Sequence, residues 1–291
     1  MDQPAALMHG ILIFDKPEGL SSAHAVETVK RRLRASRAGH GGTLDPMATG
    51  VLAVCLGEAT KLAQYLLADD KAYLAEGLLG VETDTLDRTG TVTAQRDVCV
   101  TREALLAAIA ARTGAHDQIP PMFSALKQDG QRLYRMARAG EVVEREPRRV
   151  RIDRLELVSF DPPRFTLSIA CSKGTYVRSL VADLGTDVGA GAHLTALRRT
   201  QSGRFSIEQA VTLDAIETAT LIPLPAATDL PTIIAPDDKL VHVRNGVQFQ
   251  LEQLGAENIP RFQILDGAGR LLAVCRPEDG KVIYERVFLP A

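Results

Sequence analysis

The sequence is poor in the residues that identify several common classes of protein. Tryptophan is absent, and aromatic residues make up only 4% of the 291 residues. The four cysteines lie far apart, at Cys55, Cys99, Cys171 and Cys275. Because they show no paired spacing, they argue against a disulfide framework and against a cysteine zinc site. Such cysteine usage is typical of proteins of the reducing cytoplasm.

Long apolar runs are absent as well. Runs such as Val51–Leu56 are far shorter than the ~20 residues that cross a bilayer, so we expect no membrane-spanning helix. Met1–Gly10 lacks a basic stretch followed by an apolar one, so the sequence predicts no secretory signal. Together these absences predict a cytoplasmic protein without a membrane partner.

Most standard catalytic signatures are also missing. The chain contains no GxxxxGKS or GxxxxGKT phosphate loop, no GxGxxG after a strand, no GxSxG turn and no HExxH pair. Asp84 and Asp87 could hold a metal ion, but the stretch from Asp84 to Gly90 is more simply a turn. The sequence therefore predicts neither a metal nor a cofactor.

The chain has an ordinary globular composition with an uneven distribution of charge. Hydrophobic residues make up 45% and charged residues 24%, and the length suits one large domain or two unequal ones. The formal net charge is −2, but residues 211–291 hold 7 Lys and Arg against 11 Asp and Glu. Two basic segments, Lys30–Arg37 and Lys127–Arg154, lie in the remainder. They predict either phosphate contacts, because binding follows local potential, or solvated surfaces.

Hydrophobic periodicity predicts a mixed α+β chain. We expect strands at Gly10–Phe14, Val51–Leu56, Lys71–Val81 and Phe165–Cys171, and helices from Ser22 to a stop at Gly39, over Glu58–Leu67, after Thr101 and over Tyr176–Leu184. Ser22 and Thr101 are the expected N-caps. The Arg-rich stretch 119–151 indicates a long connection with a helical part at Gln131–Arg138, and such insertions are often binding loops.

The C-terminal part shows different local signals. Leu221–Pro236 contains four prolines, which is typical of a linker. Beyond it, Asn245-Gly246, Asp266-Gly267 and Asp279-Gly280 separate short β-like runs, and this pattern predicts hairpins. We therefore expect a large domain over residues 1–225 and a small β-rich domain over residues 237–291.

The loop Gly39–Gly50 is the densest candidate for a functional site. It combines four glycines, one proline and Asp45, as expected where backbone and a carboxylate approach a ligand closely. A lone carboxylate can act as a nucleophile at carbon. The alternative is that Asp45 and Pro46 merely begin a turn.

Two further segments are candidates. Cys171–Arg178 lies where a strand passes into a helix, and Arg178 could bind a carboxylate through two hydrogen bonds. Tyr176 in the same segment could line a base pocket or simply pack. In Lys71–Tyr73, the Tyr73 ring could stack on a base, although a strand tyrosine more often belongs to the core.

Taken in order, these segments resemble the TruB family of bacterial tRNA pseudouridine synthases, which modify the T-loop uridine at tRNA position 55. The resemblance rests on seven blocks: Gly10–Pro17, Gly39–Gly50, Lys71–Tyr73, Thr83–Asp87, Ile119–Lys127, Cys171–Arg178 and Gly191–Arg199. It spans residues 10 to about 210. The acidic C-terminal part is similar, less sharply, to the small RNA-contacting β domain of that family.

This resemblance implies a mixed α/β fold around a long, largely antiparallel sheet, with the active cleft across its middle. It implies that Asp45 is the catalytic aspartate and that Arg178 is its ion-pair partner. The residues implied to line the pocket of the flipped uridine are His40, Tyr73, Tyr176, Arg178 and Leu197. The resemblance also implies that 119–151 closes over the T-arm, that 237–291 is PUA-like, and that no cofactor, metal or obligate protein partner is required.

The chemistry of this isomerisation agrees with the residues present. The reaction breaks the C1′–N1 bond of uridine and forms a C1′–C5 bond with the same base, so it needs no redox partner, energy source or metal. We expect Arg178 to keep Asp45 ionised near neutral pH, because a nearby cation favours the charged form. Unstacking the base costs a few kcal/mol, which aromatic stacking and phosphate contacts would offset.

Three other functions stay open from the sequence. One is an RNA-binding or tRNA-folding protein on the same fold, against which the presence of both Asp45 and Arg178 argues. The second is a guide-RNA-dependent synthase, a class that tends to carry basic tails, whereas this C-terminal part is acidic. The third is a glycosidase, which needs a second carboxylate, and no Asp or Glu in the matching blocks can be paired with Asp45 from sequence.

Overall fold

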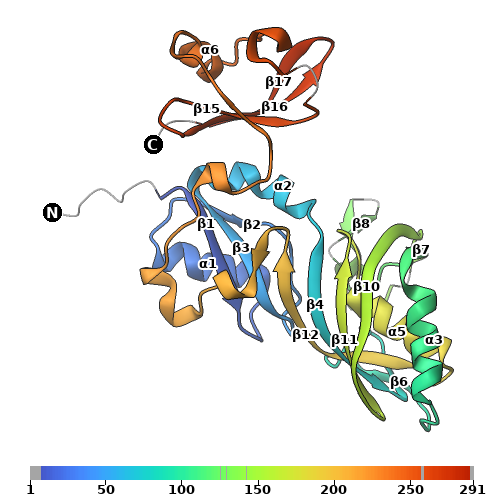
Figure 1. Ribbon diagram of the computed structural model, residues 1–291. Coiled ribbons are helices and arrows are strands. Elements are labelled where there is room, and N and C mark those ends of the chain that lie inside the picture. The colour runs from blue at the N-terminus through green and yellow to red at the C-terminus, as the bar shows by residue number, and fades with distance from the viewer. Residues whose placement is uncertain (1–7, 125, 129, 142, 257–258, 289–291) are drawn as a thin grey trace.

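The computed structural model describes residues 8–124, 126–128, 130–141, 143–256 and 259–288 (Figure 1). Within this part of the chain, nine strands form one sheet in the order β1-β3-β12-β4-β11-β10-β7, with β2 beside β3 and β13 beside β12. The strands are β1 Gly10–Lys16, β2 Ala38–His40, β3 Thr49–Leu56, β4 Lys71–Leu79, β7 Gly114–Gln118, β10 Arg148–Asp161, β11 Arg164–Cys171, β12 Ala192–Ser202 and β13 Phe205–Ser206. Among the described strand pairs of this sheet, only β3 and β12 run parallel. The predicted mixed α/β fold on a largely antiparallel sheet is therefore confirmed.

Short helices and three small sheets complete the fold. The helices are α1 Ser22–Arg32, α2 Ala63–Leu67, α3 Arg102–Arg112, α4 Leu133–Arg138, α5 Val177–Asp187 and α6 Leu240–Arg244, with 3₁₀ turns η1 Gly57–Leu62, η2 Ile207–Gln209, η3 Leu213–Thr218, η4 Leu224–Ala226, η5 Asp237–Lys239 and η6 Leu251–Leu254. The small sheets pair β5 Val81–Thr83 with β6 Val92–Gln95, β8 Lys127–Gln128 with β9 Gln131–Arg132, and β14 Thr232–Ile234 with β15 Phe262–Leu265, β16 Leu271–Glu278 and β17 Lys281–Val287. None of the helices within the described ranges is long and apolar enough to cross a membrane.

The hydrophobic core is divided between two halves of the large sheet. On one side, α1 packs Val26 and Val29 against β1 and β3. On the other side, α3 and α5 pack against β10, β11 and β12. β4 and β12 join the two halves (Figure 1). The loop before β3 buries Leu44 and Met47 in the core of the second half. That loop therefore crosses from one half of the molecule to the other at the middle of the sheet.

Helix α1 differs from the prediction at both ends. Its N-cap is Ser21, whose hydroxyl accepts a hydrogen bond from the His24 N–H at 3.2 Å, and Ser22 is the first helical residue. The helix ends at Arg32, and the positive φ of Arg34 (51°) turns the chain away. Gly39 does not stop the helix, because it lies inside β2.

Other local predictions have mixed outcomes. Thr101 caps α3 through a hydrogen bond from the Ala104 N–H at 3.2 Å, as predicted. The hairpin signals Asp266-Gly267 and Asp279-Gly280 do connect β15 to β16 and β16 to β17. Asn245-Gly246 instead follows α6, so a hairpin there is wrong.

Two predicted connections hold more structure than expected. The C-terminal sheet begins at β14, inside the stretch predicted as a linker. The predicted insertion 119–151 contains α4 and runs into β10 at Arg148. Its residues Ala125, Asp129 and Val142, like residues 1–7 of the N-terminal segment, lie outside the described part.

Candidate active site

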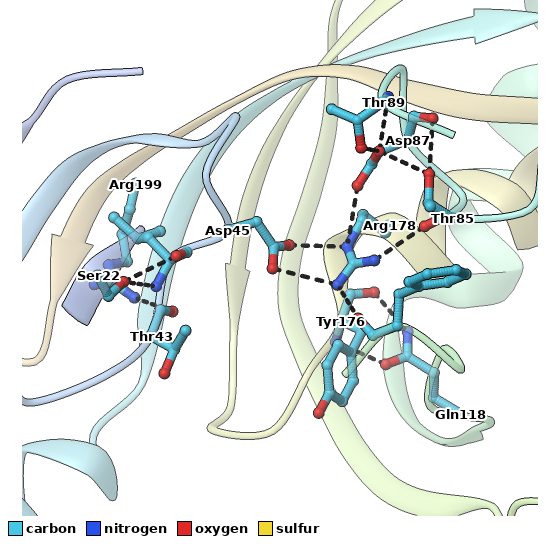
Figure 2. Close-up of polar contacts among 12 residues, drawn as sticks. Ser22, Thr43, Asp45, Thr85, Asp87, Thr89, Gln118, Tyr176, Arg178 and Arg199 are labelled. Atoms are coloured by element: carbon cyan, nitrogen blue, oxygen red, sulfur yellow. Dashed lines mark hydrogen bonds and ion pairs between the residues drawn. The ribbon is translucent and has the colours of Figure 1, made fainter. Parts of the chain in front are cut away.

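Asp45 and Arg178 form a two-point ion pair at the middle of the sheet. Asp45 lies on the loop between β2 and β3, and Arg178 lies in the first turn of α5 (Figure 2). Arg178 Nε is 2.8 Å from Asp45 Oδ2, and Arg178 Nη2 donates to Asp45 Oδ1 at 3.3 Å. The arginine side chain is only 5% exposed, whereas the aspartate side chain is 35% exposed. The Asp45 carboxylate is therefore partly open to solvent, and the Arg178 guanidinium that binds it is buried.

The guanidinium of Arg178 is fixed by contacts beyond Asp45. It donates to the backbone oxygens of Thr85 at 3.0 Å and Phe123 at 2.8 Å. Its Nε also lies 3.7 Å from Oδ2 of Asp87, a carboxylate that is itself buried. Arg178 therefore ties α5 to the turn after β5 and to the start of the 119–151 insertion, and its orientation toward Asp45 is determined by the fold.

Asp87 is a second carboxylate of the site, and the sequence did not indicate this role. Its Oδ1 accepts hydrogen bonds from the Thr85 hydroxyl at 2.8 Å, the Thr89 N–H at 2.9 Å and the Thr89 hydroxyl at 2.6 Å. Asp84 accepts one from the Thr91 N–H at 2.8 Å. The predicted turn is therefore correct, but no local pattern reveals that it presents Asp87 to Arg178 (Figure 2).

The charge state of Asp45 depends mainly on burial. Loss of water raises the pKa of its carboxyl above the ordinary value, Arg178 opposes this, Asp87 raises it further, and Lys16 lowers it. The direction is upward, so burial outweighs the adjacent cation. The sequence-based expectation that Arg178 keeps Asp45 ionised near neutral pH stays a prediction, and burial acts against the arginine.

Two buried cations hold the Asp45 loop from beneath. Lys16, fully buried, donates to the Pro46 oxygen at 3.3 Å, and burial lowers its pKa to about 8. Arg199, 1% exposed, donates to the backbone oxygens of Thr43 at 3.3 Å and Gly42 at 3.1 Å. In the sequence, Lys16 and Arg199 stood out only as members of blocks that resemble the family. A cation at the end of a buried strand was the available signal for Lys16.

Three other predicted site residues lie on strands β2, β4 and β12. His40, at the end of β2, accepts from the Gly42 N–H at Nδ1 (3.3 Å), and burial with nearby Arg199 lowers its pKa. Tyr73 is half-buried on β4 directly opposite Arg199 of β12. Leu197 is 8% exposed on β12, opposite Ala75 of β4.

Tyr176 is oriented through its backbone. Its N–H donates to Gln118 Oε1 at 2.8 Å, and Gln118 Nε2 donates back to the Tyr176 oxygen at 3.1 Å (Figure 2). Burial raises the pKa of the phenols of Tyr73 and Tyr176, and the charge of Asp45 acts in the same direction on both. The structure therefore brings both tyrosines into the electrostatic range of Asp45.

Neither a metal cluster nor a large cavity marks this site. Within the residues described, no three His, Cys, Asp or Glu side chains gather in an arrangement that could hold a metal ion. A cavity of about 430 Å³ lies between α5, Ile119–Met122 and Glu82–Leu86, and Arg145 reaches it. None of the six predicted site residues lines this cavity.

Part of the basic segment Lys30–Arg37 serves the fold. Arg32 donates to the Leu213 oxygen at 2.6 Å, and Arg37 donates to the Gly57 oxygen at 3.0 Å. These two arginines join α1 and β2 to their neighbours. For these two arginines, the contacts within the fold support neither of the sequence-based alternatives, phosphate binding or a purely solvated surface.

Solved structures share this fold. A chain from a Cbf5-Nop10-Gar1 complex matches with a TM-score of 0.77 and 25% identity, over 99% of this chain and 88% of that one. A chain from an archaeal box H/ACA sRNP Nop10-Cbf5 complex matches with a TM-score of 0.73 and 25% identity, over 98% and 87%. The large mixed sheet with its small β-rich C-terminal part matches the fold of the pseudouridine synthases.

Sequence comparison narrows this class. Residues 30–177 match the family described as "TruB family pseudouridylate synthase (N terminal domain)", and residues 178–242 match "tRNA pseudouridylate synthase B C-terminal domain". A Pseudomonas aeruginosa protein named "tRNA pseudouridine synthase B" is 46% identical to this chain, over 96% of this chain and 95% of that protein. A Stutzerimonas stutzeri protein of the same name is 55% identical, over 72% of this chain and 68% of that protein. The chain belongs to the TruB family of pseudouridylate synthases.

Proposed function

We propose that this protein is an isomerase that converts the T-loop uridine at position 55 of tRNA to pseudouridine. The activity follows from family membership and from relatives named tRNA pseudouridine synthase B. The observation that supports the assignment to residues is the partly exposed Asp45 carboxylate, which buried Arg178 holds at two points. We assign catalysis to Asp45 and the uridine pocket to His40, Tyr73, Tyr176, Arg178 and Leu197.

The geometry suits a reaction that requires one oriented anion. Arg178 contacts both oxygens of Asp45, which fixes the plane of the carboxylate and leaves it 35% exposed toward an incoming ribose and base. An anion held in this way can attack the ribose, attack the base ring, or stabilise charge while the C1′–N1 bond breaks. Each route returns the same base through its C5 atom, and none consumes a co-reactant.

The surrounding side chains suit a flipped pyrimidine. Tyr73 and Tyr176 offer two aromatic rings within the electrostatic range of Asp45, and Leu197 supplies an apolar wall. Flipping the uridine out of the T-loop costs a few kcal/mol, which stacking on such rings offsets. His40, whose pKa is lowered by burial, is a neutral hydrogen-bonding group at the base of the loop.

We favour an enzyme that acts alone, in the cytoplasm, on tRNA. Its relatives at 45–55% identity are named tRNA pseudouridine synthase B. The chains found in Nop10-containing complexes are only about 25% identical to this chain. A purely RNA-folding protein is disfavoured, because it would not require the two-point Asp45–Arg178 pair. A glycosidase is disfavoured since Asp87, the nearby second carboxylate, is buried and bound by Thr85 and Thr89.

The direct test is to map pseudouridine after incubating the purified protein with tRNA, with a transcript carrying cytidine at position 55 as control. Asp45→Asn should remove turnover while leaving tRNA binding nearly intact, because Asn keeps the shape but is neither an anion nor a nucleophile. A single-turnover rate for the variant within about tenfold of the parent, roughly 1.4 kcal/mol, would remove Asp45 from the chemistry.

A further inference from the structure

Ser22 makes two hydrogen bonds to one residue of the loop that carries Asp45. Its Oγ accepts from the Leu44 N–H at 2.8 Å and donates to the Leu44 oxygen at 2.9 Å (Figure 2). Ser22 is only 3% exposed, so water does not compete for these bonds. Because a single hydroxyl satisfies a donor and an acceptor on the same residue, both peptide groups that flank Leu44 are held against α1.

The chain after Asp45 is held from the same side. The Pro46 oxygen accepts from the Gly19 N–H at 2.8 Å and from Lys16 Nζ at 3.3 Å. The oxygen of Asp45 itself accepts from the Ala48 N–H at 3.0 Å. The segment from Lys16 to Ser22, which runs from the end of β1 to the start of α1, therefore fixes the backbone on both sides of the carboxylate.

Helix α1 does not need the Ser22 hydroxyl for its own formation. Ser21 is the N-cap, and its exposed hydroxyl accepts from the His24 N–H at 3.2 Å. Two adjacent serines thus have separate partners: Ser21 bonds to its own helix, and Ser22 bonds across to Leu44. The pair offers a natural comparison of a helix contact with a loop contact.

Building on the function proposed above, we propose that Ser22 is a positioning residue, which holds Asp45 at the place and angle that Arg178 and the flipped uridine require. Leu44 directly precedes Asp45, so a rotation of their shared peptide group displaces the carboxylate. A catalytic group must be held within about 0.5 Å of its productive position. A displacement of about 1 Å can cost about 100-fold in rate.

The experiment compares Ser22→Ala with Ser21→Ala. Each protein is measured for single-turnover rate at saturating T-arm RNA, for RNA affinity, for Tm, and for hydrogen exchange of the peptide covering residues 43–48. We expect Ser22→Ala to be about 10–100-fold slower, with affinity within about threefold and faster exchange in that peptide. We expect Ser21→Ala to lower Tm through loss of the cap, with a rate within about twofold and unchanged exchange at 43–48.

The outcomes separate positioning from folding. A Ser22→Ala rate within about threefold of the parent overturns the proposal, and so does an equal loss of rate in both variants. If Ser22→Ala shows no cooperative melting, Ser22→Cys, which is similar in volume and a weaker hydrogen-bonding group, is judged by the same criteria. If the parent itself leaves the T-loop uridine unchanged, the proposed function fails, and exchange at 43–48 still reports whether Ser22 holds the loop.

Discussion

At the residue scale, the reactivity of Asp45 depends on a balance between burial and flanking charges. Loss of water raises the pKa of its carboxyl, Arg178 opposes the rise, and Asp87 increases it. Only the ionised carboxylate is an anion and a nucleophile. The single-turnover rate should therefore fall as the pH is lowered through this raised pKa, and the acid limb should lie above the ordinary aspartate range.

Asp87→Asn should move that acid limb to lower pH. The change removes a negative charge that disfavours ionisation of Asp45. It also leaves Asp45 as the carboxylate that pairs with Arg178. The Asn oxygen can still accept from the Thr89 N–H. The measurement is the single-turnover rate from about pH 4.5 to 8. Asp84→Asn is the control, and an upward shift for Asp87→Asn would contradict this electrostatic account.

Tyr73 tests whether a half-buried ring serves the substrate or the core. If the ring stacks on the uridine, Tyr73→Phe should retain RNA binding, and Tyr73→Ala should lose about 1–3 kcal/mol of substrate interaction, roughly 5- to 150-fold. Normal binding with slow turnover in Tyr73→Phe would instead indicate that the hydroxyl transfers a proton. Tm, RNA affinity and single-turnover rate decide the matter. A lower Tm with normal activity per folded molecule would exclude Tyr73 from the site.

The sequence predicted the Asp45–Arg178 pair but not its surroundings. The pair was accessible because both residues stand in glycine-rich or strand-to-helix segments that match one family. Asp87 was read as a turn residue, which it is, and its second role arises only when that turn folds against α5. Lys16 and Arg199 act through backbone oxygens of distant residues, and sequence spacing carries no information about such contacts.

At the scale of elements, two groups of arginines in the 119–151 insertion differ in their contacts. Arg149 lies 3.6 Å from Asp117, and Arg145 lines the cavity beside α5. The second group is Arg132, Arg135 and Arg138, around Tyr134 at α4: the Arg138 guanidinium lies 5.8 Å from the Tyr134 ring centre, and Arg135 Nε donates to its hydroxyl at 3.4 Å. These three arginines form no ion pair with any carboxylate that the structure describes. The α4 group is therefore the stronger candidate for phosphate contacts.

Replacing Arg132, Arg135 and Arg138 with Ala should weaken tRNA binding and flatten its salt dependence. Each lost phosphate contact removes about 0.7–0.9 from the slope of log affinity against log salt, so three contacts remove about 2 or more. Alanine favours helix, so α4 should persist. The Arg145, Arg148 and Arg149 triple variant is the matched comparison, and we expect a smaller change in slope. An unchanged slope for the α4 variant would show that its arginines form a solvated surface.

Strong periodicity predicted elements well, whereas cap residues predicted the start of α3 correctly and both ends of α1 wrongly. The alternation Phe165, Leu167, Ile169, Cys171 is buried on one face of β11, as expected for a strand between two neighbours. The start of α1 was placed one residue late, because adjacent serines are equivalent as cap signals until their partners are known. The stop at Gly39 failed because a left-handed Arg34 had already ended the helix.

At the scale of the whole molecule, the C-terminal sheet is fixed to the catalytic part through a shared core. Leu265, Val274 and Phe288 pack in one cluster with residues of β1, β3 and α2. Lys61 Nζ donates to the Val287 oxygen at 2.7 Å and lies 5.5 Å from the centre of the Phe288 ring. Sequence patterns located a β-rich terminal part, but its attachment to η1 and α2 depends on contacts more than 200 residues apart in the chain.

Glu285 links the two parts electrostatically. Its Oε2 accepts from the Tyr65 hydroxyl at 2.9 Å, and Arg261 binds both carboxylate oxygens at 3.0 and 2.9 Å. Burial alone would raise the pKa of Glu285, but the hydrogen bonds from Arg261 and Tyr65 outweigh it, so its pKa is lowered. A carboxyl whose pKa is lowered on folding stabilises the folded state above its unfolded pKa, and this stabilisation is lost as the pH falls through the folded value.

Glu285→Gln should therefore lower Tm near neutral pH, and the difference from the parent should shrink as the pH falls below about 4.5, where the parent carboxyl begins to be protonated. Hydrogen bonds to a charged group contribute about 1.5–3 kcal/mol each, and Gln retains part of them, so we expect a loss of about 1–3 kcal/mol.

The matched control is Glu278→Gln, because Glu278 lies on the same sheet and, in its pair with Arg276, the side chains of Glu278 and Arg276 are 50% and 38% exposed. That variant should change the free energy of unfolding by less than about 1 kcal/mol. Thermal unfolding of all three proteins from about pH 3 to 8 provides the measurement. Equal effects of the two substitutions, or a Glu285→Gln deficit that grows as the pH falls, would show that the Tyr65–Glu285–Arg261 contacts do not hold the C-terminal sheet in place.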